Sequence, residues 1–399
     1  MASKLSRQAL LCLLAAITLT TVLGSIHAFS VFLIPLETLL DAGRAQISLI
    51  YSGALICLTI SVLFGYKIYP VLSPPILALV ACLVAAAGIV LAGYSDSLWM
   101  VVLGYSVLFG AANGVGYGFA LQISAQAMPQ RQGFAMGTVT AFYALGATIS
   151  PSIFSSMLAR GGVSLAMTVA GVIFAVAGVV AWALLRRSGI SFSAESTTSS
   201  GVRPGSHFIQ ILLWFGYGSG SLAGLMIIGH ATGIVVSAGG SHLLAVVGAM
   251  VIAFGSMLGG LLAGVLADRL RIITLLTLLP LLSALALVFA LFNNEALLLL
   301  GALTIVGFSY GAIIAVYPVA VINIFGSAAS SRIYGRVFTS WGFVGLLGPW
   351  LAGYFYDSSG NYTLAISVAL ASSMLSILVA GLLAKQISVD EPDLRSSRA

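Results

Sequence analysis

Two histidines, His27 and His230, stand inside long apolar stretches of the sequence. Histidine gains and loses a proton near neutral pH, and its protonated ring supplies a positive charge. An ionisable side chain surrounded by membrane-like apolar sequence is a candidate functional residue. A histidine in a helix can also serve only as a hydrogen-bonded packing residue. The pair therefore predicts either a site that holds a proton and an anion together, or two structural hydrogen-bonding residues.

The motifs of common enzyme classes are missing from the sequence. We find no nucleophile elbow, no phosphate-binding glycine loop and no cluster of metal ligands. The glycine-rich segment Gly114–Gly118 lies inside an apolar run rather than after a strand. Cys12, Cys57 and Cys82 also lie in apolar runs, without metal or disulfide spacing, and are predicted to be small buried hydrophobes. We expect no enzymatic activity, no cofactor and no metal.

The composition indicates that lipid surrounds the elements that must position these residues. Of the 399 residues, 60% are hydrophobic and 7% are charged, whereas a soluble domain has about 25% charged residues. A membrane-spanning helix needs about 20 apolar residues and satisfies its backbone groups internally. Uninterrupted runs such as Leu275–Phe292 and Ala365–Ala384 favour helices over the alternating strands of a barrel. The sequence predicts an all-α membrane protein.

Twelve transmembrane helices are predicted, separated by turn-forming or charged segments such as Asp41–Arg44 and Ser73–Pro75. Their approximate ranges are 8–36, 46–68, 75–94, 98–126, 133–157, 163–185, 207–234, 242–267, 272–292, 295–324, 333–356 and 362–385. The first follows Lys4 and Arg7, as a signal peptide would, but its apolar run exceeds the roughly 7–15 residues of a signal peptide. We expect it to stay as a helix.

The basic residues predict the orientation, because Lys and Arg are enriched in cytoplasmic loops. With the N-terminus in the cytoplasm, only Arg44 and Arg160 of the 16 Lys and Arg residues fall outside. An even number of spans then returns the C-terminus to the cytoplasm. The net charge of +6 is thus an orientation signal, and we expect no nucleic-acid partner. The predicted location is the inner (plasma) membrane, multi-pass, with both termini cytoplasmic.

The longest hydrophilic stretch, 186–206, is rich in Ser, Thr and Gly and predicts a flexible linker. It divides the chain into a six-helix half at 1–187, a cytoplasmic linker at 188–204 and a second six-helix half at 205–399. His27 and His230 then occupy the first span of each half, which makes them equivalent by the repeat. Glycines at helical spacing, such as Gly255, Gly259, Gly260 and Gly264, predict close helix packing.

Several segments carry a resemblance to a known family. They are Gly24–Phe32, Pro35, Arg44–Gln46, Gly114–Gly118, Pro129–Gly137, Ala223–His230, Pro318, Asn323–Gly326 and Arg332–Gly335. In this order and spacing they resemble the major facilitator superfamily, specifically the branch of oxalate/formate antiporters and monocarboxylate transporters. The resemblance to the superfamily covers nearly the whole chain. It implies the major facilitator fold, in which two six-helix halves rock around a midplane site.

The resemblance also implies that aromatic residues line a cavity. The predicted substrate-binding residues are His27, Phe29, Asn113, Tyr117, Tyr143, His230, Tyr310 and Trp341. Tyrosine suits this role because its hydroxyl forms hydrogen bonds while its ring bounds an apolar wall. Asn113 and Tyr117 are four residues apart and share a helix face. Ordinary helix packing is the alternative for each residue.

A conformational latch is predicted from the segment Gly264–Arg271, which resembles the cytoplasmic signature of the superfamily. The resemblance implies that this loop holds neighbouring helix ends together in one conformation. The predicted latch residues are Asp268, Arg269, Arg131 and Arg332. The alternative is that these charges only mark the orientation. The corresponding segment of the first half, Gly65–Tyr69, lacks the acidic residue.

The predicted spans place no charged residue securely near the bilayer midplane, and this constrains the charge of the substrate. Carboxylate carriers of this branch often have a basic residue in the eighth span, and oxalate carriers have another in the eleventh. By resemblance, the matching positions in this sequence are Gly260 and Trp341, and neither is basic. Two carboxylates without a fixed countercharge would be costly to bury, which disfavours a dicarboxylate. We expect a secondary active transporter of a small organic anion, above all a monocarboxylate, working by alternating access and coupled to protons through His27 and His230.

Two other functions stay open. One is transport, including export, of a neutral, zwitterionic or amphipathic solute, and the other is a membrane sensor or scaffold built on a transporter fold. The expected partners are a small-molecule substrate, protons and the lipid bilayer. By analogy with the superfamily, we expect a working monomer.

Overall fold

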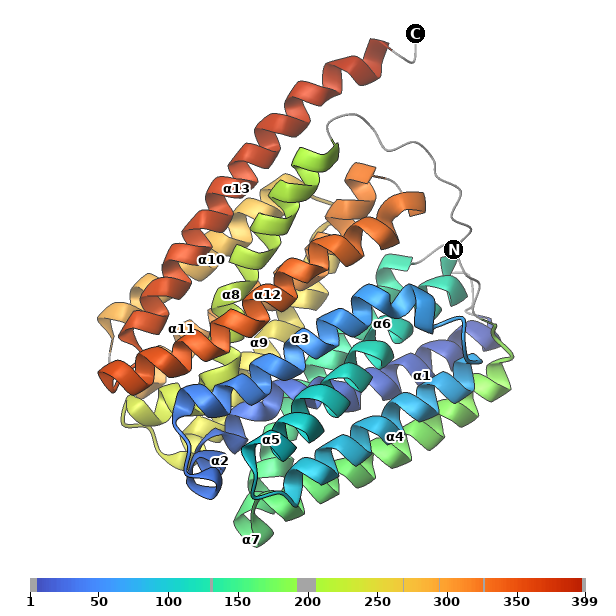
Figure 1. Cartoon of the computed structure of the whole chain (residues 1–399). Helices are drawn as coiled ribbons and strands as arrows, with labels where there is room; N and C mark the ends of the chain where they lie inside the picture. The colour runs from blue at the N-terminus through green and yellow to red at the C-terminus, as the bar shows by residue number, and fades with distance from the viewer. Residues whose placement is uncertain are drawn as a thin grey trace.

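The computed structural model describes residues 6–129, 132–191, 206–267, 269–293, 295–325 and 327–396, and within these ranges the chain is helical without β-strands. The elements are α1 (Arg7–Leu23), the 3₁₀-helix η1 (Gly24–Phe32), α2 (Leu33–Leu40), α3 (Arg44–Ile68), α4 (Pro74–Gly93), α5 (Leu98–Val101), the π-helix η2 (Val102–Phe109), α6 (Gly110–Ala127), α7 (Gln132–Ser188), α8 (Ser206–Ser237), α9 (His242–Ala267), α10 (Ile272–Phe292), α11 (Ala296–Phe325), α12 (Ser327–Ser359) and α13 (Thr363–Ser396). The start of α1 and the end of α13 lie toward the same end of one bundle (Figure 1).

Ten helices in the described ranges are long and apolar enough to cross a membrane. The all-α membrane fold predicted from composition is therefore confirmed, whereas the count of twelve spans stays a prediction. The helix α7 covers two predicted spans, 133–157 and 163–185, and its helical geometry breaks at Gly161 and Gly162. Gly162 has a φ of 68°, a conformation that costs glycine little. Most of the predicted linker, 192–204, lies outside the described residues.

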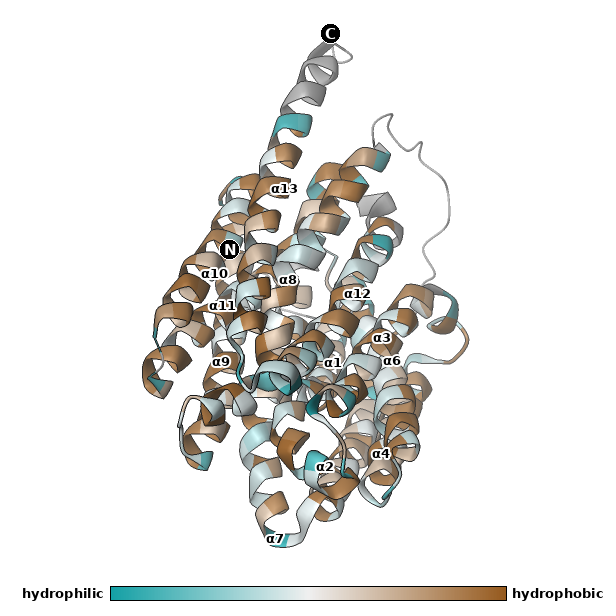
Figure 2. Ribbon diagram, turned by 60° about the vertical axis from the view of Figure 1, so that its left-hand side comes forward, coloured by the Kyte–Doolittle hydropathy of each residue, from teal (hydrophilic) through white to brown (hydrophobic). Residues whose placement is uncertain are grey.

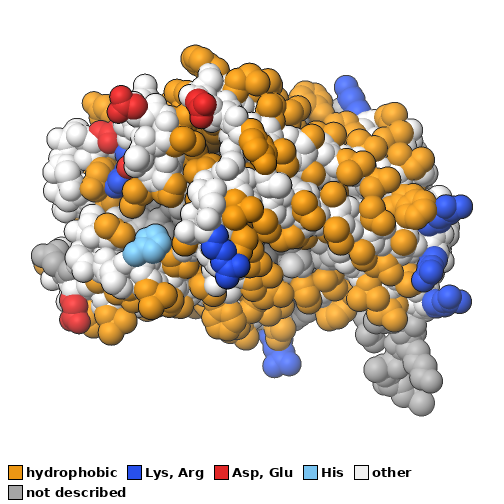
Figure 3. Space-filling model, turned by 90° about the horizontal axis from the view of Figure 1, so that it is seen from below, with side chains coloured by type: hydrophobic (Ala, Val, Ile, Leu, Met, Phe, Trp, Pro, Cys, Tyr) orange, Lys and Arg blue, Asp and Glu red, His pale blue; other side chains and the backbone are white. Residues whose placement is uncertain are grey.

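The outer surface matches a lipid environment. Hydrophobic residues predominate along the helices, as the ribbon coloured by hydropathy shows (Figure 2). On the face in Figure 3, hydrophobic side chains cover most of the middle, acidic side chains lie toward one end, and several Lys and Arg lie toward the other. Backbone groups on such a surface must be satisfied within the helices, because lipid offers no hydrogen bonds.

The first predicted span, 8–36, does not form one regular helix. It runs as α1, η1 and α2, and the nine residues of η1 adopt 3₁₀ geometry. Runs of 3₁₀-helix longer than three or four residues are uncommon and often mark functional segments. The predicted first span falls within a candidate membrane span, Arg7–Leu40, as expected, and the 3₁₀ geometry within it is an additional finding. Its physical reason lies in tertiary contacts, since η1 is surrounded by α7, α8 and α9.

In the described residues, the halves of the chain before and after the linker contact each other mainly through three helix pairs: α3 with α12, α7 with α9, and η1 with α8. Glycine permits one of these contacts, because a Cβ on Gly342 of α12 would overlap the side chain of Thr59 in α3. Within the second half, a Cβ on Gly259 of α9 would overlap the backbone carbonyl of Phe308 in α11. The glycine spacing thus reflects close backbone approach.

Two glycines of α9 provide a matched test of this packing. We expect Gly259→Ala to destabilise the protein by about 1–3 kcal/mol, because the backbone of α11 must move away. Gly264→Ala, five residues further on, meets no atom within 4 Å and should be neutral or stabilising by up to about 1 kcal/mol. Thermal unfolding of both variants in detergent measures the difference. Equal unfolding temperatures would contradict the close approach of α9 and α11.

Candidate functional site

A cavity lies between the two halves of the chain, with about 670 Å³ of space not filled by atoms, open solvent included. Its walls come from η1, α3, α6 and α7 of the first half and from α8, α9, α11 and α12 of the second. The lining residues are His27, Leu58, Tyr117, Thr140, Ala141, Tyr143, Ala144, Ala147, Ile228, Ala253, Ser256, Gly260, Tyr310, Gly311, Ile314, Phe338 and Trp341. None of these described residues carries a fixed charge. The cavity is therefore a mainly apolar space with a few neutral polar groups, as small-molecule sites commonly are.

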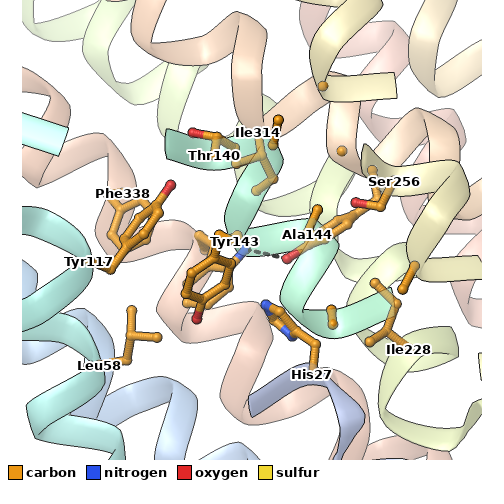
Figure 4. Close-up of a pocket in the computed structure, with 17 residues that line it drawn as sticks. His27, Leu58, Tyr117, Thr140, Tyr143, Ala144, Ile228, Ser256, Ile314 and Phe338 are labelled. Carbon is orange, nitrogen blue, oxygen red and sulfur yellow. Dashed lines mark hydrogen bonds between the residues drawn. The ribbon is translucent and has the colours of Figure 1, made fainter. Parts of the chain in front are cut away.

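The 3₁₀ segment η1 brings His27 to this cavity (Figure 4). Three side chains from neighbouring elements satisfy carbonyl groups at the start of η1 and within it. Asn113 Nδ2 donates to the carbonyl of Leu23 at 2.7 Å, Tyr105 Oη to that of Ile26 at 3.3 Å, and Thr232 Oγ1 to that of Ser30 at 2.5 Å. Polar backbone that leaves α-helical geometry inside a membrane needs such partners. They hold η1 in place and thereby fix the position of His27.

His27 is held by aromatic neighbours. Its Nδ1 lies 2.6 Å from the hydroxyl oxygen of Tyr51 on α3. The ring of Tyr143 on α7 meets the imidazole edge-on, with ring centroids 5.6 Å apart. No described residue forms a hydrogen bond with Nε2 of His27, which leaves this nitrogen available on the cavity side. Figure 4 shows His27 and Tyr143 converging on the same space from η1 and α7.

Tyr143 is oriented by Asn113. The Tyr143 hydroxyl donates to Oδ1 of Asn113 at 2.9 Å, and the same amide donates to Leu23. Tyr117 packs beside Tyr143, with ring centroids 4.8 Å apart, and also lines the cavity. Asn113 is fully buried and is not a lining residue, so its contact is with the wall rather than with the cavity. Tyr117 and Tyr143 form an aromatic wall, and Asn113 sets its geometry.

The second half contributes a matching polar group. The indole Nε1–H of Trp341 on α12 donates to the hydroxyl oxygen of Tyr310 on α11 at 3.0 Å (dashed in Figure 4). Because this oxygen accepts from Trp341, and no described residue accepts from it, the Tyr310 proton is available to a bound solute. Trp341 is itself stacked on Phe338 at 5.0 Å. Ser256 of α9 adds a hydroxyl group, so that the second half contributes three polar side chains to the lining: Ser256, Tyr310 and Trp341.

His230 lies elsewhere, in a polar network that we call the Arg44 cluster, formed by Glu37, Arg44, His230, Asp357 and Tyr362. Arg44 forms a two-pronged ion pair with Glu37, at 2.5 and 2.9 Å, and donates to the hydroxyl of Tyr362 at 3.3 Å. The carboxylate of Asp357 accepts from the backbone N–H groups of Arg44 and Ala45 at 3.2 and 2.9 Å. Asp357 on α12 therefore caps the N-terminus of α3 across the two halves.

Both ring nitrogens of His230 have protein partners. Nε2 lies 2.7 Å from the carbonyl oxygen of Pro349, which can only accept, so Nε2 carries the proton. Nδ1 lies 3.0 Å from the hydroxyl of Tyr362. Because that hydroxyl oxygen accepts from Arg44, its own proton points to Nδ1. The hydroxyl of Ser48, 3.1 Å from Nε2, donates to the carbonyl of Arg44 and joins the network. His230 is thus neutral and saturated here, outside the cavity lining.

The remaining predicted residues are placed as follows. Phe29 is fully buried and stacks on Tyr51 at 5.5 Å, behind the cavity wall. Asp268 and Arg131 lie outside the described residues, and the side chain of Arg332 is not described. Arg269 lies exposed in the turn after α9. The predicted latch therefore stays a prediction.

Sequence reasoning missed several residues of the site. Tyr51, Ser256 and Phe338 carried no motif, and only the fold brings them to the cavity or to His27. Arg44 pairs with Glu37, seven residues away, but its other partners Asp357 and Tyr362 are more than 300 residues away in sequence. In the described residues, no group of three His, Cys, Asp or Glu could hold a metal ion.

Comparison with known proteins gives the family context. No protein-family model matches the chain. The chain is 26% identical over 355 residues to the "uncharacterized MFS-type transporter YhjX" of Escherichia coli strain K12, an alignment that covers 85% of this chain and 86% of the relative. The printed name of this relative supports the major facilitator superfamily. A second relative, the "uncharacterized MFS-type transporter YcxA" of Bacillus subtilis strain 168, is 24% identical over 374 residues, covering 88% and 89%.

The two relatives and the ten apolar helices together support a multi-pass membrane transporter. They support the superfamily that the sequence motifs predicted. The oxalate/formate and monocarboxylate branch stays a prediction, since neither relative's name states a substrate. Relatives of this kind are transporters rather than enzymes.

The Arg44 cluster generates a stability prediction. Glu37→Gln should destabilise the protein by about 3 kcal/mol, because it removes the carboxylate that pairs with the buried guanidinium of Arg44. The matched control is Glu295→Gln, which changes an exposed glutamate for which no ion pair with a described residue is found. Thermal unfolding in detergent should show a clear loss for the first variant and almost none for the control. Identical unfolding temperatures would show that the ion pair contributes nothing.

Proposed function

We propose that this protein is a secondary active transporter of a small organic monocarboxylate. The observation that carries the proposal is the polarity of the cavity. Two groups on opposite walls, the His27 nitrogen without a partner among the described residues and the hydroxyl of Tyr310, face a space otherwise bounded mainly by aromatic and aliphatic side chains. A carboxylate can accept from both, while its hydrocarbon part lies against Tyr117, Tyr143 and Phe338.

The absence of charge in the described lining supports a monoanion over a dianion. Burying one carboxylate between neutral donors is costly, and burying two without a countercharge is much more so. Proton coupling is part of the proposal, because a proton taken up by His27 would offset the charge of the bound anion. The predicted branch of oxalate/formate antiporters and monocarboxylate transporters agrees with such a substrate.

We propose alternating access as the mechanism, with the two halves moving about the cavity. In the predicted orientation, α3 begins at the outer face of an inner (plasma) membrane, and both termini are cytoplasmic. The Arg44 cluster would then join the halves at the outer end, and its bonds would have to break for the cavity to open outward. The break at Gly161 and Gly162 supports counting α7 as two of twelve spans.

Paired ligands test the proposal directly. We expect purified protein in detergent to be stabilised by a short monocarboxylate such as propionate, by about 2.7 kcal/mol at a hundredfold excess over its dissociation constant. Propionamide has nearly the same shape without the charge and should stabilise much less, as should a dicarboxylate such as malonate. Equal stabilisation by the amide would overturn the proposal of an anionic substrate. It would favour the second candidate, a carrier of a neutral or zwitterionic solute, which the absence of charge in the described lining also supports.

The role of His27 has its own test. His27→Leu should weaken binding of the stabilising monocarboxylate at least tenfold, because the donor is lost from the first half. His242→Leu is the matched control, since His242 is exposed and remote from the lining residues. Uptake of the labelled monocarboxylate into proteoliposomes should fall in the first variant and persist in the second. Unchanged uptake by His27→Leu would remove His27 from the site.

A further inference from the structure

Tyr51 is the residue behind His27, and its environment leaves its hydroxyl little choice. The side chain is fully buried in α3, with its ring stacked on Phe29 at 5.5 Å and against Gly229 of α8. Within the described residues, the partner of its hydroxyl is Nδ1 of His27, at 2.6 Å. A buried phenolic proton without an acceptor carries the full cost of desolvation. The hydroxyl of Tyr51 therefore donates to Nδ1.

This hydrogen bond decides where the neutral imidazole keeps its own proton. A neutral histidine has one N–H and one acceptor nitrogen. Because Nδ1 accepts from Tyr51, the proton lies on Nε2, the nitrogen for which no described residue provides a partner. His27 lines the cavity, so this arrangement directs an N–H donor to a ligand.

His230 shows the same arrangement, except that its Nε2 has a partner within the protein. Its Nδ1 accepts from a tyrosine, Tyr362, and its Nε2–H donates to the carbonyl oxygen of Pro349. In both halves, then, a buried tyrosine fixes the tautomer of a histidine in the first span of that half. The difference is that a protein carbonyl takes the Nε2–H of His230, whereas the cavity lies next to His27.

We propose that Tyr51 is a positioning residue that holds His27 in its neutral Nε2–H tautomer, so that His27 presents an N–H donor to an oxygen atom of the substrate. This inference rests on the proposed function, because the acceptor it calls for is the carboxylate of a monoanion. It also specifies what proton uptake requires. A second proton on the ring must occupy Nδ1, and the hydroxyl of Tyr51 must turn away to admit it.

Nitrogen NMR of histidine-labelled protein tests the tautomer without any substrate. The chain has four histidines, and replacing the exposed His207 and His242 by glutamine leaves His27 and His230. A further His27→Gln change assigns the remaining signals. At mildly alkaline pH, where free histidine is neutral, we expect His27 to show a protonated Nε2 and an unprotonated Nδ1. A protonated Nδ1 in the otherwise native protein would overturn the proposal.

Tyr51→Phe keeps the ring that stacks on Phe29 and removes only the hydroxyl. We expect His27 to populate both tautomers in this variant. Tyr105→Phe is the matched control, because Tyr105 also packs on Phe29 but donates to the carbonyl of Ile26 rather than to His27. It should leave the His27 tautomer unchanged. An unchanged tautomer in Tyr51→Phe as well would overturn the role of Tyr51.

Ligand binding completes the test. Tyr51→Phe should weaken binding of the stabilising monocarboxylate about three- to tenfold, because the donor tautomer is no longer enforced. Loss of the tautomer without any change in affinity would overturn the link between Tyr51 and the substrate. If no monocarboxylate binds even the native protein, the proposed function fails, while the NMR result still decides the tautomer. The two failures are therefore distinguishable.

Discussion

Backbone carbonyl groups that lie deep in a membrane must have hydrogen-bond donors, and the site described above depends on how η1 meets this requirement. A helix that leaves α geometry in lipid needs partners from its neighbours. Asn113, Tyr105 and Thr232 supply them to Leu23, Ile26 and Ser30. Two of these donors come from the first half of the chain and one from the second. The irregular segment that carries His27 is thus held from both sides of the bundle.

The two histidines illustrate how surroundings assign different roles to the same residue type. Each has a tyrosine hydroxyl at Nδ1. The Nε2–H of His230 donates to the carbonyl of Pro349, and its ring thereby joins α8, α12 and the turn before α13. The Nε2 of His27 has no described protein partner and lies at the cavity. A free donor next to a cavity is suited to a ligand, whereas a saturated one is suited to structure.

Polar and apolar contacts between the halves are arranged differently along their length. Near the start of α3, the Arg44 cluster provides hydrogen bonds to side chains and backbone across the halves, beside an ion pair within the first half. Further along, α3 and α12 approach through glycine, as at Gly342 and Thr59, with van der Waals contact in place of hydrogen bonds. In the proposed mechanism, the polar end has discrete bonds to break, and the glycine-lined contact allows the helices to tilt against one another.

Much of the fold and part of the site could be predicted before any coordinates. Charge content and apolar runs required helices in a membrane, because only helices and closed barrels satisfy the backbone in lipid and uninterrupted apolar runs do not fit the alternating strands of a barrel. His27 could be singled out by its type and surroundings, and Tyr117, Tyr143, Tyr310 and Trp341 by resemblance. Each of these five lines the cavity. The same reasoning could not separate His27 from His230, because the two look alike in sequence.

The sequence by itself determined the class of molecule, its solvent and a short set of candidate residues, since these follow from composition and local pattern. Only the tertiary structure decided that the first span turns into a 3₁₀-helix at Gly24 and that Tyr51 lies behind His27. It also decided that the carbonyl of Pro349 accepts a hydrogen bond from Nε2 of His230. Tyr51 is 24 residues from His27, and the carbonyl of Pro349 is 119 residues from His230. Hydrogen bonds between distant segments depend on how helices pack, and helix packing is not written in any local stretch of sequence.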